Sequence, residues 1–220
     1  MRHCLAILML MINTGLPAQS PPRIAISTDF TVQHNLSPDQ KYWAIGQNLR
    51  GEWKLVFPSP VYVGFSYYTK GNFSNQLTAA AKDPATVPAG INYINKGSMR
   101  FSHLTVGLKH YIIGSWEAEQ DWNLYGLTGL GVLMGRTSNV HSEIIDTNQY
   151  QLPVLSGSRR FSRLTLDLGA GIEIPMGGDM YLYSEAKTFI PLTYFPSQYL
   201  LNYKYNPLTL NLGIGVRVLF

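Results

Sequence analysis

The stretch LTLNLGIGVRVLF, Leu208–Phe220, decides the fold because its side chains alternate between two kinds. Every even position is Leu, Ile, Val or Phe, whereas the odd positions up to Arg217 are Thr, Asn, Gly or Arg. Successive side chains of a β-strand point to opposite faces, so the stretch predicts a strand with one apolar and one polar face. Most strands have ~5–6 residues, and a strand that crosses a bilayer at a tilt needs ~9–11. A run of this length therefore favours a membrane.

The same alternation recurs along the chain, most clearly in Leu164–Ile174. It predicts an all-β fold with eight long strands. Their approximate ranges are Arg23–Gln33, Trp43–Phe57, Val61–Thr69, Met99–Ile113, Trp122–Arg136, Phe161–Ile174, Met180–Ile190 and Leu208–Phe220.

The connections between these segments alternate in length. Those after the second, fourth and sixth segments are short: Pro58–Pro60, Gly114–Asp121 and Pro175–Asp179. The others are longer, notably Lys70–Ser98 and Thr137–Arg160. Short periplasmic turns, long extracellular loops and an even strand number are typical of outer-membrane barrels. We therefore expect an eight-stranded antiparallel transmembrane β-barrel.

Four stretches carry a resemblance to a known family: Leu104–Ile112 (LTVGLKHYI), Leu124–Gly135 (LYGLTGLGVLMG), Leu164–Pro175 (LTLDLGAGIEIP) and Gly213–Phe220 (GIGVRVLF). Together they resemble the small outer-membrane β-barrel proteins, in particular the Bacteroidetes-type outer membrane protein beta-barrel domain. The final aromatic residue, Phe220, looks like the signal that the barrel-insertion machinery reads. The resemblance covers nearly all of the chain after the leader and specifies architecture better than function.

The first 20 residues have the form of a signal peptide. Met1–His3 is basic, Cys4–Ile12 is apolar, and small residues follow at Ala18 and Ser20. The apolar run is too short for a transmembrane helix, which needs ~20 residues. We expect a leader at 1–20 and a barrel at 21–220. The chain's one cysteine lies in the leader, so no disulfide is expected.

The composition excludes several classes of protein. Charged residues make up 14% of the chain and hydrophobic residues 45%, with 20 glycines and 14 tyrosines. Soluble domains have ~25% charged residues, and neither a disordered, collagen-like, coiled-coil nor disulfide-rich chain has this composition. The net charge of +4 comes from dispersed basic residues that form no stripe, so no nucleic-acid partner is expected.

If the apolar faces contact lipid, the opposite faces line the interior. An eight-stranded barrel is just wide enough for its side chains to fill, and buried charges are tolerated when paired or hydrated. We expect an ion-pair network that is closed to solutes. The inward charged positions would be Arg23, Asp29, Arg50, Glu52, Lys54, Lys109, Arg163, Asp167, Glu173, Glu185, Lys187 and Arg217.

Glycines at inward-facing positions of the strands would make room for long inward side chains, among them Tyr62, Tyr68 and Tyr183. These glycines are at positions 129, 131, 169, 171, 213 and 215. Their Gly-x-Gly pairs do not open a helix, which argues against a dinucleotide site. Aromatic residues would form belts at both membrane interfaces. The candidates are Trp53, Phe57, Trp116, Trp122 and Phe220 on the turn side, and Tyr42, Trp43, Tyr67, Tyr194 and Phe195 on the loop side.

A weak internal repeat links two of the segments. Arg100–Val106 (RFSHLTV) is similar to Arg160–Leu166 (RFSRLTL), and both begin a strand that follows a long loop. A duplicated hairpin and selection by similar strand environments explain the repeat equally well.

No catalytic, cofactor-binding or metal-ligating residue is expected. The histidines after the leader, at 34, 103, 110 and 141, lack metal-ligand spacing. Ser102 and His103 are neighbours in the sequence and would point to opposite faces of a strand, which argues against a catalytic pair. We therefore expect a protein that is not an enzyme, with a lipid hydrolase kept as an open alternative.

The expected function is a structural or surface-binding, adhesion-type role through the outer loops. One alternative is a barrel linked to secretion, small-solute passage or lipid modification. Another is a soluble, lipocalin-like barrel, which would place its apolar residues inside; the glycine-rich polar faces favour a lumen instead. Expected partners are outer-membrane lipid and lipopolysaccharide, the insertion machinery through Phe220, and an extracellular protein or glycan.

Overall fold

The computed structural model describes residues 24–54, 59–117, 121–194, 197–201 and 206–220. The predicted signal peptide lies outside these residues, as do Arg23, Phe57 and Phe195. Within the described residues, no helix is long and apolar enough to cross a membrane.

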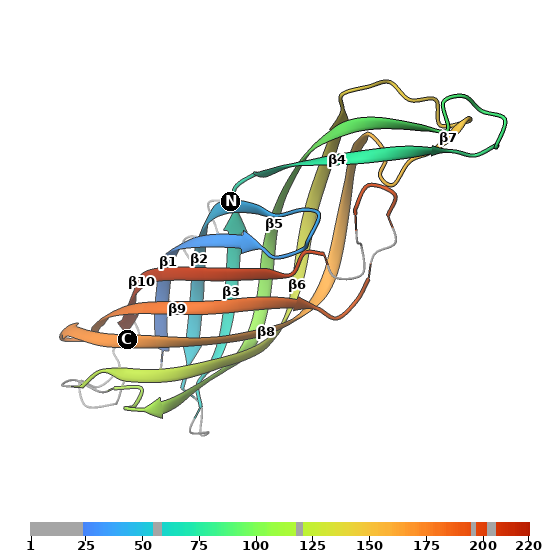
Figure 1. Cartoon of the computed structure of the whole chain (residues 1–220). Helices are drawn as coiled ribbons and strands as arrows, with labels where there is room; N and C mark the ends of the chain where they lie inside the picture. The colour runs from blue at the N-terminus through green and yellow to red at the C-terminus, as the bar shows by residue number, and fades with distance from the viewer. Residues whose placement is uncertain (1–23, 55–58, 118–120, 195–196, 202–205) are drawn as a thin grey trace, which may run out of the picture.

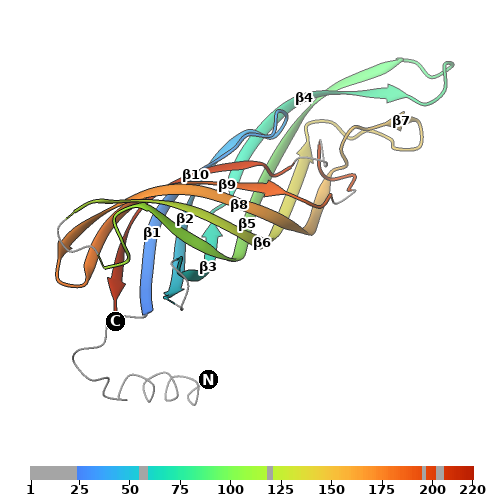
Figure 2. The ribbon, with the colours of Figure 1, turned by 90° about the horizontal axis from the view of Figure 1, so that it is seen from below.

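In the part of the chain that the structure describes, ten strands form one antiparallel sheet, and eight of them close into a barrel (Figures 1 and 2). Around the barrel the order is β1, β2, β3, β5, β6, β8, β9 and β10, with β10 paired back onto β1. The prediction of an eight-stranded antiparallel barrel is confirmed. The strands are β1 Ile24–Asn35, β2 Tyr42–Trp53, β3 Val61–Tyr68, β4 Gly71–Ala81, β5 Gly90–Ile113, β6 Asn123–His141, β7 Tyr150–Gln151, β8 Gly157–Gly177, β9 Met180–Pro191 and β10 Thr209–Leu219.

Part of the predicted long loops is regular β-structure. The Lys70–Ser98 segment contains all of β4 and the first part of β5, which pair along their length. β3 and β4 follow each other along the same edge of β5, so the hairpin continues the barrel wall outward (Figure 1). The small and polar residues of β4, GNFSNQLTAAA, lack the apolar alternation that identifies a lipid-facing strand. That is why the sequence predicted a loop here.

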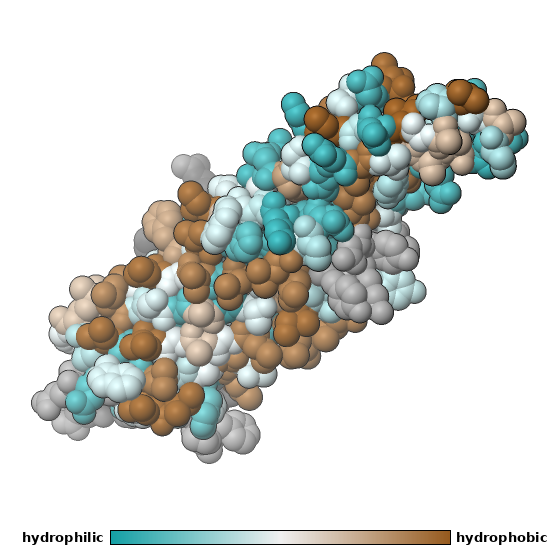
Figure 3. All heavy atoms as spheres, viewed as in Figure 1, coloured by the Kyte–Doolittle hydropathy of each residue, from teal (hydrophilic) through white to brown (hydrophobic). Residues whose placement is uncertain are grey.

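The apolar faces of the strands point outward. Burial alternates residue by residue along β1 and β10, and Phe30 and Ile214 on the outer face are 73% and 63% exposed. Apolar residues gather over the barrel and hydrophilic ones over much of the protruding end (Figure 3). Such an apolar wall is stable in contact with the hydrocarbon of a bilayer and unfavourable in contact with water. This orientation is the reverse of a lipocalin-like barrel, so that alternative is wrong.

The two ends of the barrel differ as predicted. The β8–β9 turn is tight, with Gly177 and Gly178 at φ values of +108° and +59° that side chains rarely adopt. The first and last strands meet at this end, where the Ile24 and Phe220 backbones exchange hydrogen bonds of 3.3 and 2.8 Å. Recognition of Phe220 by the insertion machinery stays a prediction.

The inward glycines make space for large side chains, as expected. A Cβ on Gly131 would lie 2.1 Å from the His103 ring, and one on Gly129 would lie 2.8 Å from the Tyr62 hydroxyl. Tyr62, Tyr68 and Tyr183 all point inward and are buried. The packing of the interior therefore requires glycine at these positions, because glycine has no side chain to collide with the buried rings.

We predict that Gly215→Ala destabilises the barrel by about 1–3 kcal/mol, the usual penalty of overpacking. Its Cβ would lie 2.2 Å from the Thr28 carbonyl oxygen and 2.5 Å from the Asp29 Cβ, and backbone cannot easily move aside. Gly126→Ala is the matched control, because its nearest atom is the Gly169 carbonyl oxygen at 3.9 Å. Urea unfolding in detergent micelles measures both, and equal effects would contradict this packing argument.

Candidate functional site

A network of buried ion pairs occupies the turn-side half of the barrel interior. The Arg217 guanidinium lies 3.2 Å from Glu52 and 3.1 Å from Glu173. Lys109 contacts the same two carboxylates, at 3.5 Å from Glu52. Two cations thus share two carboxylates supplied by β2 and β8, which stabilises each charge against burial.

The network continues toward the middle of the barrel. Arg50 lies 2.8 Å from Glu52 and 2.6 Å from Glu185, and Lys187 lies 3.0 Å from Glu185. The Tyr125 hydroxyl donates a 2.7 Å hydrogen bond to Glu185. Side chains from β2, β5, β6, β8, β9 and β10 therefore meet in one connected set. The predicted interior ion-pair network is present.

Two of the predicted inward charges behave differently. Lys54 lies at the end of the barrel, where its side chain is 38% exposed and ion-pairs with Glu117 at 2.7 Å. Arg163 is buried, but it donates a 2.8 Å hydrogen bond to the Thr193 carbonyl oxygen. Lys54 follows the last residue of β2, so strand alternation no longer sets its direction.

Trp116 closes the turn-side end of the interior. It is 3% exposed, and the Arg217 guanidinium carbon lies 4.1 Å from its ring centroid. Arg217 also donates a 3.2 Å hydrogen bond to the Trp116 carbonyl oxygen. The prediction that Trp116 belongs to the aromatic belt is wrong, because it lies in a turn that folds back under the barrel.

An aromatic cluster closes the opposite end. Tyr42, predicted as a belt residue, is 3% exposed and packs inside with Phe73 and Met99. It shares the inward phase of Ala44, which places it away from lipid. Trp43, Tyr67, Tyr194, Trp53, Trp122 and Phe220 are exposed, as the belts require.

Between the two ends lies a cavity of about 20 Å³, lined in part by Asp29, Arg50, His103, Asp167 and Lys187. A cavity of this size holds about one water molecule. At this level the polar side chains therefore fill the interior almost completely.

His103 belongs to this core. Its ring stacks on Phe189 at 4.1 Å, and Nε2 lies 2.9 Å from the Thr165 hydroxyl and 3.4 Å from Asp167. Ser102 lies on the opposite face of β5, so the two residues are not brought together. Within the described residues, no three His, Cys, Asp or Glu side chains are placed to hold a metal ion.

We predict that Arg217→Ala lowers the free energy of unfolding by about 3–5 kcal/mol, because Glu52 and Glu173 lose a buried partner. Lys54→Ala removes a cation from an exposed ion pair and should cost at most about 1 kcal/mol. Urea unfolding of both variants in detergent micelles gives the comparison. A small loss for Arg217→Ala would show that water or the remaining cations replace it.

The outer end of the barrel carries a folded extension, formed by the β4–β5 hairpin, the upper part of β6 and residues 142–156. Ala79, Tyr93 and Tyr150 form its core, with Leu77, Ala81, Ile91, Ile145 and Leu152 packed around them. β7, which lies within the connection 142–156 between β6 and β8, pairs with the far end of β4 and holds this connection against the β4–β5 hairpin. The sequence predicted two separate loops here, and the structure joins them into one unit.

Polar contacts fasten the connection to the hairpin turn. The Tyr150 hydroxyl donates a 3.1 Å hydrogen bond to the Pro88 carbonyl oxygen, and Lys82 Nζ donates a 2.7 Å bond to the Thr147 carbonyl oxygen. The rings of Tyr93 and His141 pack against each other at a tilt of 53°, with centroids 4.7 Å apart. Burial lowers the pKa of His141 below its usual value near 6.5.

We predict that the extension loosens as the pH falls from 7.5 to 5. Because the pKa of His141 is depressed in the folded extension, the unfolded form binds the proton more readily. The contribution of His141 to the stability of the extension is therefore present above pH ~6.5 and is lost as the pH falls below it. Limited proteolysis within 82–89 and 142–149 measures the change. His141→Phe keeps a ring without the titration and should weaken the pH dependence; an unchanged pH profile in this variant would refute the assignment.

The geometry defines a class of protein. A closed antiparallel barrel with an apolar outer wall, charged packed interior and short turns at one end is an integral outer-membrane β-barrel. The chain is an outer-membrane protein of this class.

Comparison with known proteins supports the fold. Neither protein-family profiles nor curated proteins gave a match. Among solved structures, Neisserial surface protein A is similar at a TM-score of 0.55 and 10% identity, over 90% of this chain and 97% of that one. The N-terminal barrel domain of Pseudomonas aeruginosa OprF has a TM-score of 0.51 and 9% identity, over 91% and 100%.

A major outer membrane protein from Thermus thermophilus is also similar, at a TM-score of 0.50 and 10% identity, over 90% of this chain and 99% of that one. These identities are low, so the likeness is one of fold. The small outer-membrane barrel architecture agrees with the prediction. The narrower Bacteroidetes-type resemblance stays a prediction.

Proposed function

We propose that this chain is a surface-binding barrel that contacts an extracellular protein or glycan through its folded extension. The observation that carries the proposal is the contrast between the two parts of the molecule. The barrel interior is filled by paired charges and closed at both ends, so the barrel serves as an anchor. The extension has its own core and stands beyond the membrane-facing wall.

The tip of the extension offers apolar side chains to a partner. Val87 and Ile144 are 89% and 105% exposed, in two turns that the Tyr150–Pro88 and Lys82–Thr147 hydrogen bonds hold together. Contacts at fixed positions bind with less loss of entropy than those on mobile loops. An ordered tip of this kind favours recognition over a purely structural role.

The test is adhesion of bacteria that express the chain to arrays of immobilised matrix proteins and glycans. We expect Val87→Ser with Ile144→Ser to reduce the adhesion that the wild-type chain confers at least tenfold, because buried apolar contacts at an interface are lost. Glu143→Gln, an exposed neighbour of Ile144, is the matched control and should retain adhesion. Heat-modifiable migration on gels verifies that each barrel is folded.

Two results would overturn the proposal. One is adhesion that is the same with and without the chain on every coated surface. The other is steady porin-sized conductance of the purified protein in planar bilayers, which would favour solute passage through the barrel.

A further inference from the structure

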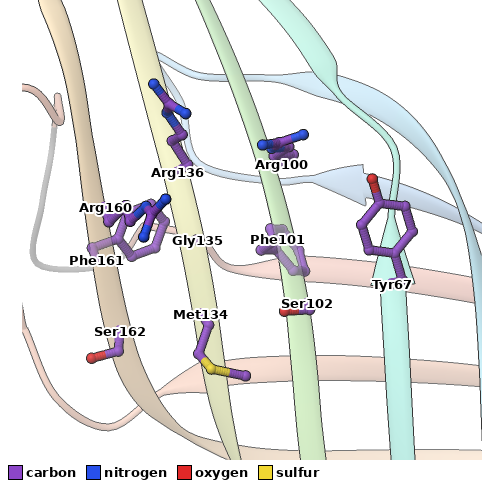
Figure 4. A pocket seen from close by; sticks show the side chains of 10 residues that line it. All are labelled: Tyr67, Arg100, Phe101, Ser102, Met134, Gly135, Arg136, Arg160, Phe161 and Ser162. Atoms are coloured by element: carbon purple, nitrogen blue, oxygen red, sulfur yellow. The ribbon is translucent and has the colours of Figure 1, made fainter. Parts of the chain in front are cut away.

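Three arginines form a row across the outer wall of the barrel. Arg100 of β5 lies directly opposite Arg136 of β6, which in turn lies opposite Arg160 of β8. All three are exposed on the outer face. They line one hollow of about 650 Å³ together with Tyr67, Met134 and serines 102 and 162 (Figure 4).

This row has no carboxylate to balance it. Within the described residues, none of the three arginines takes part in an ion pair, and Arg136 donates a 3.1 Å hydrogen bond to the Ser158 hydroxyl. The five carboxylates on the described strands are all buried in the interior: Asp29, Glu52, Asp167, Glu173 and Glu185. Like charges directly opposite each other destabilise a sheet. A row of cations at this place therefore favours a bound anion.

The row lies at the outer edge of the apolar wall. On β8, the outward residues from Leu164 to Ile174 are all apolar. At ~3.3 Å per residue and a tilt near 40°, that run spans about 25 Å, the height of the lipid-facing band. Arg160 comes four residues beyond Leu164, on the side away from the tight turns. The arginines thus lie at the level of lipid headgroups in the outer leaflet.

The side chains around the row fit a molecule with a charged head and apolar tails. Toward the membrane, the next outward row is Ser102, Met134 and Ser162. The row after it, Leu104, Val132 and Leu164, is wholly apolar. Away from the membrane, Ser98, Ser138 and Ser158 form a row of hydroxyls. Lys70 joins Arg100 and Arg136 around a second hollow of about 270 Å³. Charge and polarity therefore change in the order in which they change along a phospholipid or lipid A molecule.

We propose that this arginine row binds a phosphate group of lipopolysaccharide in the outer leaflet. The guanidinium groups donate charge-assisted hydrogen bonds to the phosphate oxygens, and an acyl chain lies along the apolar wall below Met134. The site gives a structural location to the lipid partner expected from the sequence. It uses neither Val87 nor Ile144 at the tip of the extension, so it stands or falls separately from the adhesion proposal.

The site also explains the internal repeat. The matching RFS stretches place Arg100 and Arg160 at equivalent positions on β5 and β8, with Arg136 of β6 between them. A shared environment at the same membrane level accounts for the similarity, whether or not the hairpins were duplicated.

The test titrates purified barrel in detergent micelles with bisphosphorylated lipid A, dephosphorylated lipid A, inorganic phosphate and soluble heparin, using thermal stability and fluorescence as readouts. We expect lipid A to stabilise the wild-type barrel and the dephosphorylated form to do so at least tenfold less well. Arg136→Gln should weaken lipid A binding about tenfold, the range for a lost charge-assisted hydrogen bond.

The matched control is Arg159→Gln, which removes the cation next to Arg160 in the sequence. Arg159 lies on the opposite face of β8, where its cross-strand partner is the buried Thr137 of β6. It should bind lipid A as the wild type does. Without lipid, the triple Gln variant of Arg100, Arg136 and Arg160 should be at least as stable as wild type, because the like-charge row is gone. A barrel that this variant destabilises without lipid would show that the arginines act structurally.

Two further outcomes would overturn the proposal. Equal stabilisation by both forms of lipid A would show that the acyl chains bind without the phosphates. Binding of heparin or inorganic phosphate as tight as that of lipid A would mean that the row recognises a soluble anion.

Discussion

The structure depends on one constraint: inside a bilayer no water is present to satisfy an unpaired backbone N–H or carbonyl group. The β1–β10 pairing, eleven residue pairs from Ala25–Leu219 to Asn35–Thr209, closes the sheet and removes both edges. Closure at eight strands leaves an interior that side chains must fill, and the polar faces of the strands turn toward it. The ion-pair network, the inward glycines and the Trp116 closure all follow from that space.

The part of the fold that lies in the membrane could be predicted from the sequence because lipid imposes a strict period of two. Leu164–Ile174 and Leu208–Phe220 show that period, and both are strands in the barrel. Beyond the membrane the constraint ends. The small and polar residues of β4 carry no such pattern, so its pairing with β5 and β7 could not be read from the chain.

The candidate sites show the same division. The phase of a strand identified Glu52, Glu173 and Arg217 as inward, yet it could not say which carboxylate each cation meets. Trp116 lies in a turn, where side chains do not alternate between two faces, so the strand pattern could not predict its direction. The arginine row needed the register of three strands, because Arg100, Arg136 and Arg160 are far apart in the sequence and only their pairing puts them side by side.

β5 belongs to the barrel wall and to the extension without interruption. Its 24 residues make one strand of about 80 Å. It pairs with β3 inside the barrel wall and with β4 in the extension. The turn at its outer end is therefore carried at a fixed distance from the bilayer. A peptide grafted into residues 82–89 would be held well clear of the membrane surface, which makes this hairpin a natural position for displaying foreign sequences on a bacterial cell.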